Sequence, residues 1–177
     1  MSDYEKGAFA TGNKLRVGPN GEAMTKTMLT TNSLKLLDLA DVRSEAICLE
    51  DIAHGLSMHV RWAGQGRWLS VAQHSVMVMR MIEEHGAEWH FESCPRLLRM
   101  ALMHDAHEAY IGDLSGGLKY LLRDSVLKEL ILKLDLAIEY AIPNLSFDTL
   151  RGDAEALTWA EEQLVPRECA DDRDQVG

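Results

Sequence analysis

Apolar residues along this chain recur mainly at helical spacing, three to four positions apart, and no segment alternates apolar and polar residues over any length. The pattern predicts helices over residues 50–62, 70–85, 95–112, 125–142 and 148–164. Residues 34–39 are predicted to form a short strand or turn, and residues 113–119 a glycine-containing connection. We therefore predict an all-α fold, a single-domain helical bundle of about five to seven helices.

Residues that favour helix ends support these segments. Ser70 and Gln73 form a capping box at the start of the second helix, and Gly86 is placed to cap its end. Pro95 suits the first position of the third helix. Pro143 and Pro166 are expected to stop the last two helices, because proline cannot donate the next helical hydrogen bond.

Composition narrows the class of protein. A chain of 177 residues with 46% hydrophobic content can bury one core, and a net charge of -10 argues against binding to duplex nucleic acid. The three cysteines form no C-x-x-C pair, so we expect reduced thiols in a cytoplasmic protein, with neither a secretion signal nor a membrane span. We predict an irregular arm over residues 1–28, the domain over residues 29–166 and an acidic tail over residues 167–177.

The segment from Ala101 to Tyr110 carries ionisable side chains within an apolar stretch. His104 and Glu108 stand four residues apart, so a helix would place them on one face, with Asp105 between them. Burying such groups is costly unless a metal ion or strong pairing compensates. His107 is interpreted as a residue that lines the cleft or hydrogen-bonds outward, with a role as substitute ligand less favoured.

Imidazole and carboxylate groups on three predicted helices are candidate metal ligands. These groups belong to His74, to the adjacent pair His104–Asp105 and to Asp153. Such nitrogen and oxygen donors suit Zn²⁺, Co²⁺ or Mn²⁺, and also admit Mg²⁺. Spacing alone does not select these four residues from the other histidines and acids.

The order of the motifs resembles a known family. His74…His104-Asp105…Asp153 is similar to the H…HD…D signature of the HD-domain metal-dependent phosphohydrolases. The closer likeness is to small HD proteins of the 5′-deoxynucleotidase type and to the phage dATP triphosphohydrolases. It covers roughly residues 36–164 and rests on Ile52-Ala-His-Gly-Leu56, Arg61-Trp62, Ser70-Val-Ala-Gln-His-Ser75, His104-Asp-Ala-His-Glu-Ala-Tyr-Ile-Gly-Asp113 and Lys119.

The resemblance implies a role for each matching residue. His74, His104, Asp105 and Asp153 are expected to ligate the metal. Glu108 and Asp113 are the expected catalytic acids, Arg61 and Trp62 are expected to contact the nucleotide, and Lys119 its phosphate. The chain departs from its relatives at Ser115-Gly116-Gly117, where they often carry prolines, and this leaves the length of the phosphate chain open.

The resemblance implies a metal-dependent phosphohydrolase of 2′-deoxynucleotides, located in the cytoplasm, or in the host cytoplasm if a phage encodes it. A dATP-preferring triphosphohydrolase that releases deoxynucleoside and triphosphate is slightly favoured over a 5′-deoxynucleotidase that releases phosphate from deoxynucleoside monophosphates. A non-catalytic, nucleotide-binding helical module is the alternative from another class. The apolar face of the helix predicted at residues 125–142 is compatible with a homo-oligomer.

Overall fold

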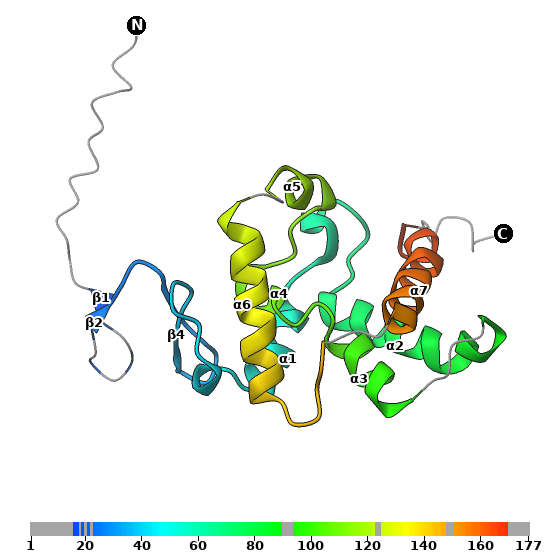
Figure 1. Cartoon of the computed structure of the whole chain (residues 1–177). Helices are drawn as coiled ribbons and strands as arrows, with labels where there is room; N and C mark the ends of the chain where they lie inside the picture. Colours follow the sequence, from blue (N-terminus) through cyan, green and yellow to red (C-terminus); the bar gives the residue numbers. More distant parts are fainter. Residues whose placement is uncertain are drawn as a thin grey trace, which may run out of the picture.

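Helices dominate the structure, a computed structural model (Figure 1), and this confirms the all-α, single-domain prediction. It describes residues 16–17, 19, 21, 23–89, 94–122, 125–147 and 151–169, without the side chains of residues 16, 17, 23, 88, 89, 151–153 and 165–169. The α-helices are α1 (Leu49–Met58), α2 (Val71–His85), α3 (Pro95–Met103), α4 (Glu108–Ile111), α5 (Gly116–Leu121), α6 (Val126–Ala141) and α7 (Arg151–Cys169). Short 3-10 helices are η2 (Ser44–Ala46), η3 (Arg61–Gly64) and η4 (Gly86–Trp89).

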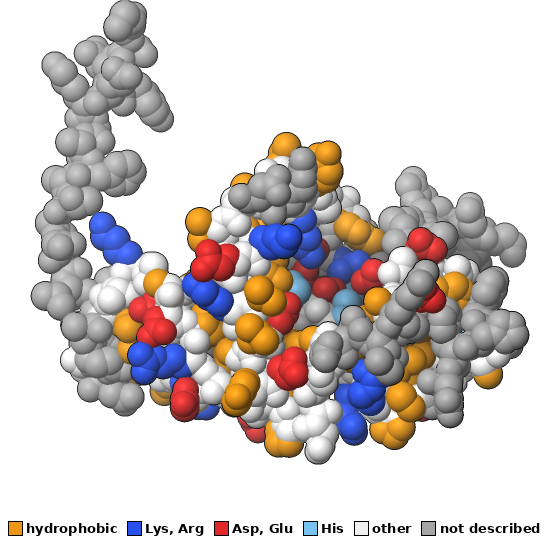
Figure 2. All heavy atoms as spheres, viewed as in Figure 1, with side chains coloured by type: hydrophobic (Ala, Val, Ile, Leu, Met, Phe, Trp, Pro, Cys, Tyr) orange, Lys and Arg blue, Asp and Glu red, His pale blue; other side chains and the backbone are white. Residues whose placement is uncertain are grey.

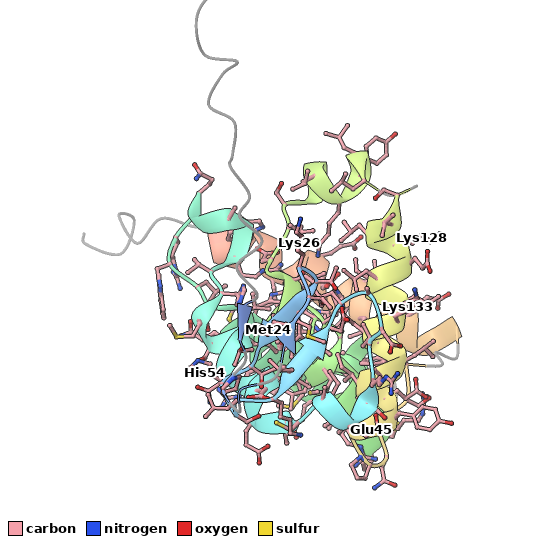
Figure 3. The ribbon with its side chains drawn as sticks, turned by 90° about the vertical axis from the view of Figure 1, so that its left-hand side faces the viewer. Met24, Lys26, Glu45, His54, Lys128 and Lys133 are labelled. Atoms are coloured by element: carbon pink, nitrogen blue, oxygen red, sulfur yellow. The ribbon has the colours of Figure 1, made fainter. Side chains whose placement is uncertain are left out.

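Two small antiparallel hairpins precede the helices. Strand β1 (Arg16–Val17) pairs with β2 (Ala23–Met24), and β3 (Met28–Thr30) pairs with β4 (Leu36–Asp38). They lie at the end of the molecule opposite α7 (Figure 1). The view onto this side shows Met24 and Lys26 in front of the helices and Lys128 and Lys133 along α6 (Figure 3). The strands after residue 15 correct the prediction of an irregular arm, and residues 1–15 lie outside the described part.

Several predicted helix ends are confirmed. The Ser70 hydroxyl accepts a hydrogen bond from the Gln73 backbone at 3.1 Å, and the Gln73 side chain accepts one from the Ser70 backbone at 3.0 Å, which completes the capping box. Pro95 begins α3, and Ser125 caps α6. Helix α6 ends before Pro143, as predicted.

The helix predicted over residues 95–112 is interrupted. Helix α3 ends at Met103, residues 104–107 form turns, and α4 begins at Glu108. The prediction treated the segment as one helix because its apolar spacing is continuous. The backbone instead tightens: the amides of Ala106, Glu108 and Ala109 donate to carbonyls three residues earlier, at 2.9–3.2 Å.

Other predicted boundaries shift. The first helix ends at Met58 instead of Trp62, and the expected glycine-containing connection holds the short helix α5. The last helix continues through Pro166 to Cys169, so this proline, three residues before the end, does not stop it; residues 148–150 and 170–177 lie outside the described part. The domain limits of 29 and 166 remain a prediction.

Two apolar clusters meet at α3. One joins β4, α1 and α6, with Leu37, Ile52, Leu134 and Ile138 fully buried, and it includes Met103 at the end of α3. The other joins α2, α3 and α7, through Val78, Ile82, Met100, Ala156, Ala160 and other residues. Because α3 belongs to both clusters, the turn that follows it is held between two well-packed halves of the molecule.

Two expectations about the chain's environment concern its cysteines and its helices. Cys48 and Cys94 are free thiols, and the side chain of Cys169 is outside the description. Among the described residues, none of the helices combines the length and the apolar character that crossing a bilayer requires.

Candidate metal centre

The ionisable residues singled out by the sequence gather where α2, the turn at residues 104–107, α4 and α7 come together. Figure 2 shows histidine, acidic and basic side chains in a hollow below α5 and beside α7. His74 and Glu108 are almost completely buried, with exposed fractions of 1% and 0%, and Asp105 keeps 9%. Burial of so many titratable groups at one place needs compensating charge.

The interruption after α3 determines which of the ionisable side chains lie on the same side of the turn. In a tightened turn with three residues per repeat, residues three apart share a side, so Asp105 and Glu108 lie together. A regular helix would instead pair His104 with Glu108, as the sequence analysis expected. His104 is thereby directed toward α2 and α7, and Glu108 toward α5.

One part of the cluster, here called the histidine side, consists of His74, His104, Asp105 and Glu161. The Nε2 atom of His104 lies 3.2 Å from an Asp105 carboxylate oxygen and 3.3 Å from a Glu161 carboxylate oxygen. The Nε2 atom of His74 lies 3.8 Å from the same Asp105 oxygen. Ligands bound at about 2.1 Å around a tetrahedral ion stand about 3.4 Å apart. The observed separations fit that value.

The orientation of His104 favours a ligand role. Its Nδ1 atom lies 2.7 Å from the Ala101 carbonyl, so this nitrogen donates its proton and Nε2 keeps the lone pair when the ring is neutral. The Nε2 atom is buried and makes no hydrogen bond of acceptable geometry within the described residues. A divalent ion satisfies such an atom, so the donor set of the histidine side fits a metal.

The electrostatics of the histidine side without an ion are those of a buried ion pair. Burial alone lowers the pKa of His104, but the carboxylates of Asp105 and Glu161 outweigh this and raise it to about 10. Burial raises the pKa of Asp105, and the nearby His104 more than reverses this, to well below its usual range. A proton on His104 thus occupies the place where the geometry accommodates a metal ion.

The other part of the cluster, here called the lysine side, consists of Asp105, His107, Glu108 and Lys119. The ammonium of Lys119, on α5, donates to a Glu108 carboxylate oxygen at 2.5 Å. Burial and the charge of Asp105 nevertheless raise the pKa of Glu108 to about 7. His107 is buried, and its Nδ1 atom lies 3.0 Å from Asp135 on α6. The lysine side therefore already contains a cation, the ammonium of Lys119, next to its carboxylates.

The loop before α2 borders the cluster. Arg61 places a guanidinium nitrogen 3.3 Å from Asp105 and lies over the Trp62 ring, 5.6 Å from its centre. Trp62 and Ala63 adopt left-handed backbone angles, with φ of 53° and 52°, which are unfavourable for such residues. Asp113 accepts a hydrogen bond from the Trp62 backbone amide and so holds this turn. The Trp62 ring packs against Gly66.

Sequence reasoning named most of this cluster but missed one member. The structure brings together His74, His104, Asp105, Glu108, Arg61 and Lys119. Asp113 contacts the Trp62 loop, and Asp153 belongs to α7 with its side chain outside the described residues. Glu161, also on α7, was not predicted. Nothing in the sequence separates it from the neighbouring acids Glu155 and Glu162, although it adjoins the buried Ala160.

A large pocket lies elsewhere in the described part of the chain. It measures about 920 Å³, lies between the β3–β4 hairpin and η2, and carries charges of both signs from Lys35, Asp38, Asp41 and Arg43. It lacks the convergence of imidazole and carboxylate donors seen around Asp105. The donor cluster is therefore the candidate centre.

Two known proteins that are similar to this chain are both described as uncharacterized. No family model matches the chain. YfdR of Escherichia coli, an uncharacterized protein, is 37% identical over 105 residues, which are 58% of this chain and 52% of YfdR. An uncharacterized protein of Rhodobacter capsulatus is 39% identical over 85 residues, 44% of this chain and 39% of that protein. The chain spans about half or less of the length of these curated relatives.

Proposed function

We propose that this protein is a metal-dependent phosphohydrolase of 2′-deoxynucleotides, of the HD-domain type. The observation that carries the proposal is the convergence of His74, His104 and Asp105 at separations of 3.2 and 3.8 Å, inside a buried site. These are the residues expected from the H…HD part of the family signature. Glu161 lies within reach as a further ligand, and Asp153 on the same helix remains a predicted one.

The residues around the ion have separate tasks in this proposal. A bound divalent ion would supply Lewis acidity to a phosphoryl group and to the attacking water. Arg61 and Lys119 neutralise charge that develops on phosphate oxygens. Glu108, with a pKa of about 7, accepts or returns a proton near neutral pH. Phosphoryl transfer requires mainly positioning and charge stabilisation, so this set is sufficient.

The nucleoside end of the substrate is assigned to the Trp62 loop. The Trp62 ring offers a flat apolar face to a base or sugar. A dATP-preferring triphosphohydrolase is slightly favoured, on the resemblance alone. The 5′-deoxynucleotidase reaction is the alternative, and the glycines at 116 and 117 in α5, where relatives often have prolines, leave the length of the phosphate chain open.

A non-catalytic nucleotide-binding module is the competing function from another class. Such a protein would need the ligands for stability and would have no use for Glu108 as a proton carrier. The raised pKa of Glu108 beside the candidate metal favours the enzyme, because perturbed acids gather at catalytic sites.

The test is a panel of deoxy- and ribonucleoside mono- and triphosphates, incubated with the full chain and Mn²⁺, Co²⁺ or Zn²⁺. Chromatography separates phosphate from triphosphate. Intact triphosphate from dATP supports the triphosphohydrolase, and phosphate from deoxynucleoside monophosphates alone supports the nucleotidase. Metal binding without turnover of any nucleotide rejects both and leaves the binding module. His104→Ala is the control for contaminating activity.

A further inference from the structure

The lysine side has the composition of a cation site in its own right. Asp105, His107 and Glu108 each contribute one donor atom, and these atoms all lie within 4.8 Å of one another. All three residues are buried, with exposed fractions of 9%, 8% and 0%. Two carboxylates and an imidazole form a donor set that divalent ions accept. This set shares only Asp105 with the histidine side.

The donors of this set are incompletely satisfied. One oxygen of Glu108 binds Lys119, but its other oxygen, Oε2, is buried and has no hydrogen-bond partner within the described residues. Leaving a buried carboxylate oxygen without a partner is costly. The unpartnered oxygen therefore gives Glu108 a donor atom for a divalent ion that takes the place of the ammonium.

His107 is oriented as a metal ligand commonly is. Asp135 on α6 lies 3.0 Å from its Nδ1 atom, and a carboxylate on one ring nitrogen fixes the tautomer and leaves Nε2 with the lone pair. This contact also anchors the ring to a long, capped helix. The hydrogen bond to Asp135 agrees with the interpretation that His107 lines the cleft or hydrogen-bonds outward, and the same orientation is compatible with the role of ligand, which was less favoured from the sequence.

Lys119 supplies the positive charge at this place. Its ammonium lies against Glu108, and the charges of Asp105 and Asp113 also act to raise its pKa against the effect of burial. The side chain keeps 38% exposure and stands on a short helix, so the ammonium can leave for solvent. The Lys119 ammonium thus faces the carboxylates of Glu108, Asp105 and Asp113, and Asp105 also has the Arg61 guanidinium at 3.3 Å.

We propose that the lysine side is a second cation position, filled by the Lys119 ammonium in the native protein and open to a divalent ion when that ammonium is removed. The inference rests on the proposed metal centre through Asp105, which would be shared by the two positions. It deepens the proposed function: the reaction runs with one divalent ion and uses Lys119 as the second positive charge next to the phosphate.

The experiment counts bound Mn²⁺ by equilibrium dialysis and electron paramagnetic resonance in three full-length proteins. Wild type and Lys119→Arg, which keeps the charge, are expected to bind one equivalent. Lys119→Met is expected to bind two, and the ions should be spin-coupled, because ions that share a carboxylate lie about 3.5–4 Å apart. Adding His107→Ala to Lys119→Met should return the count to one.

Each outcome has a definite meaning. One equivalent in wild type and also in Lys119→Met overturns the second position and leaves the metal centre intact. Two equivalents in wild type overturn the role given to Lys119. No bound ion in any of the proteins overturns the metal centre itself, together with the proposed function. If Lys119→Met does not fold, Lys119→Gln, which is also neutral but polar, takes its place in the same count.

Discussion

The two sides of the cluster share Asp105 and are similarly buried, yet their positive charge has different sources. On the histidine side, two imidazoles, which carry charge only when protonated, face Asp105 and Glu161, and the Arg61 guanidinium lies 3.3 Å from Asp105 at the border of the cluster. On the lysine side, a permanent ammonium lies on Glu108. A protonated imidazole can lose its proton and then bind a metal ion, whereas the lysine ammonium has to move away before an ion can bind in its place. The histidine side is therefore the expected metal position.

The pKa values express the same contrast. Without an ion, the histidine side stores a proton on an imidazole, since the carboxylates raise the pKa of His104 to about 10 against the effect of burial. The lysine side gains or loses one on a carboxyl near neutral pH, since burial and Asp105 raise the pKa of Glu108 to about 7. One side is thus suited to exchanging a proton for a metal, and the other to moving a proton during a reaction.

The largest expected effect comes from removing the imidazole of the histidine side. His104→Ala should lose both bound metal and turnover, by at least about 10³-fold, since loss of a single electrostatic donor already costs about 10²–10³. Metal analysis after gel filtration and initial rates measure the two effects. His54→Ala, an exposed histidine on α1, is the control. A His104→Ala protein with full metal content would remove the histidine side from consideration.

Glu108→Gln tests the lysine side alone. It keeps the shape of the side chain and removes its ability to take a proton, so the rate should fall about 10²–10⁴-fold while metal content is unchanged. If Glu108 is a base, its ionised form is the active one, so the wild-type rate should fall as the pH drops below about 7. The variant should lack this dependence. Equal pH profiles for the two proteins would exclude Glu108 as the proton carrier.

Residues that favour helix ends were sufficient to predict most of the helices from the sequence. The Ser70–Gln73 pair, Pro95 and Pro143 act on their immediate neighbours, and each marks a boundary that the structure has. The interruption at residues 104–107 has no such marker. The hydrogen bonds there span three residues instead of four, a change that the continuous apolar spacing of the sequence does not indicate.

The candidate site was predicted unevenly for the same reason. His74, His104 and Asp105 were named because a family order of motifs points to them. Glu161 carries no such mark, and it joins the cluster only because α7 packs against α2. The pairing of Lys119 with Glu108 likewise depends on α5 folding where a connection was expected. Contacts between separate elements are what the sequence left undetermined.

Asp113 offers a smaller test, at the border of the lysine side. The resemblance makes it a catalytic acid, whereas the structure has it accepting the Trp62 amide, a positioning role. Asp113→Ala should raise KM about ten- to hundredfold, because a hydrogen bond to a charged group contributes about 1.5–3 kcal/mol. Metal content should not change. Asp113→Asn keeps an acceptor oxygen and should be milder; an equal loss of kcat in both variants would favour the catalytic role.

The smallest expected effect comes from a packing change that displaces Glu108 on the lysine side and leaves the histidine side in place. A Cβ on Gly55 of α1 would stand 2.6 Å from the carbonyl oxygen of Ala109, the residue after Glu108, so Gly55→Ala must push α4 away. The cost should be about 1–3 kcal/mol, or roughly 2–4 °C in Tm per kcal/mol. Because α4 carries Glu108 while His74 and Glu161 lie on α2 and α7, turnover should fall severalfold with metal retained.

Gly117→Ala is the matched control for that packing effect, because a Cβ there would meet nothing within 4 Å. On α5 it should leave Tm unchanged or raise it slightly, since alanine favours a helix over glycine by about 1 kcal/mol. Thermal unfolding, metal analysis and rates on the three proteins complete the test. Loss of metal from Gly55→Ala in step with its loss of turnover would mean that the two sides of the cluster move as one unit, and the division between them would then have no functional content.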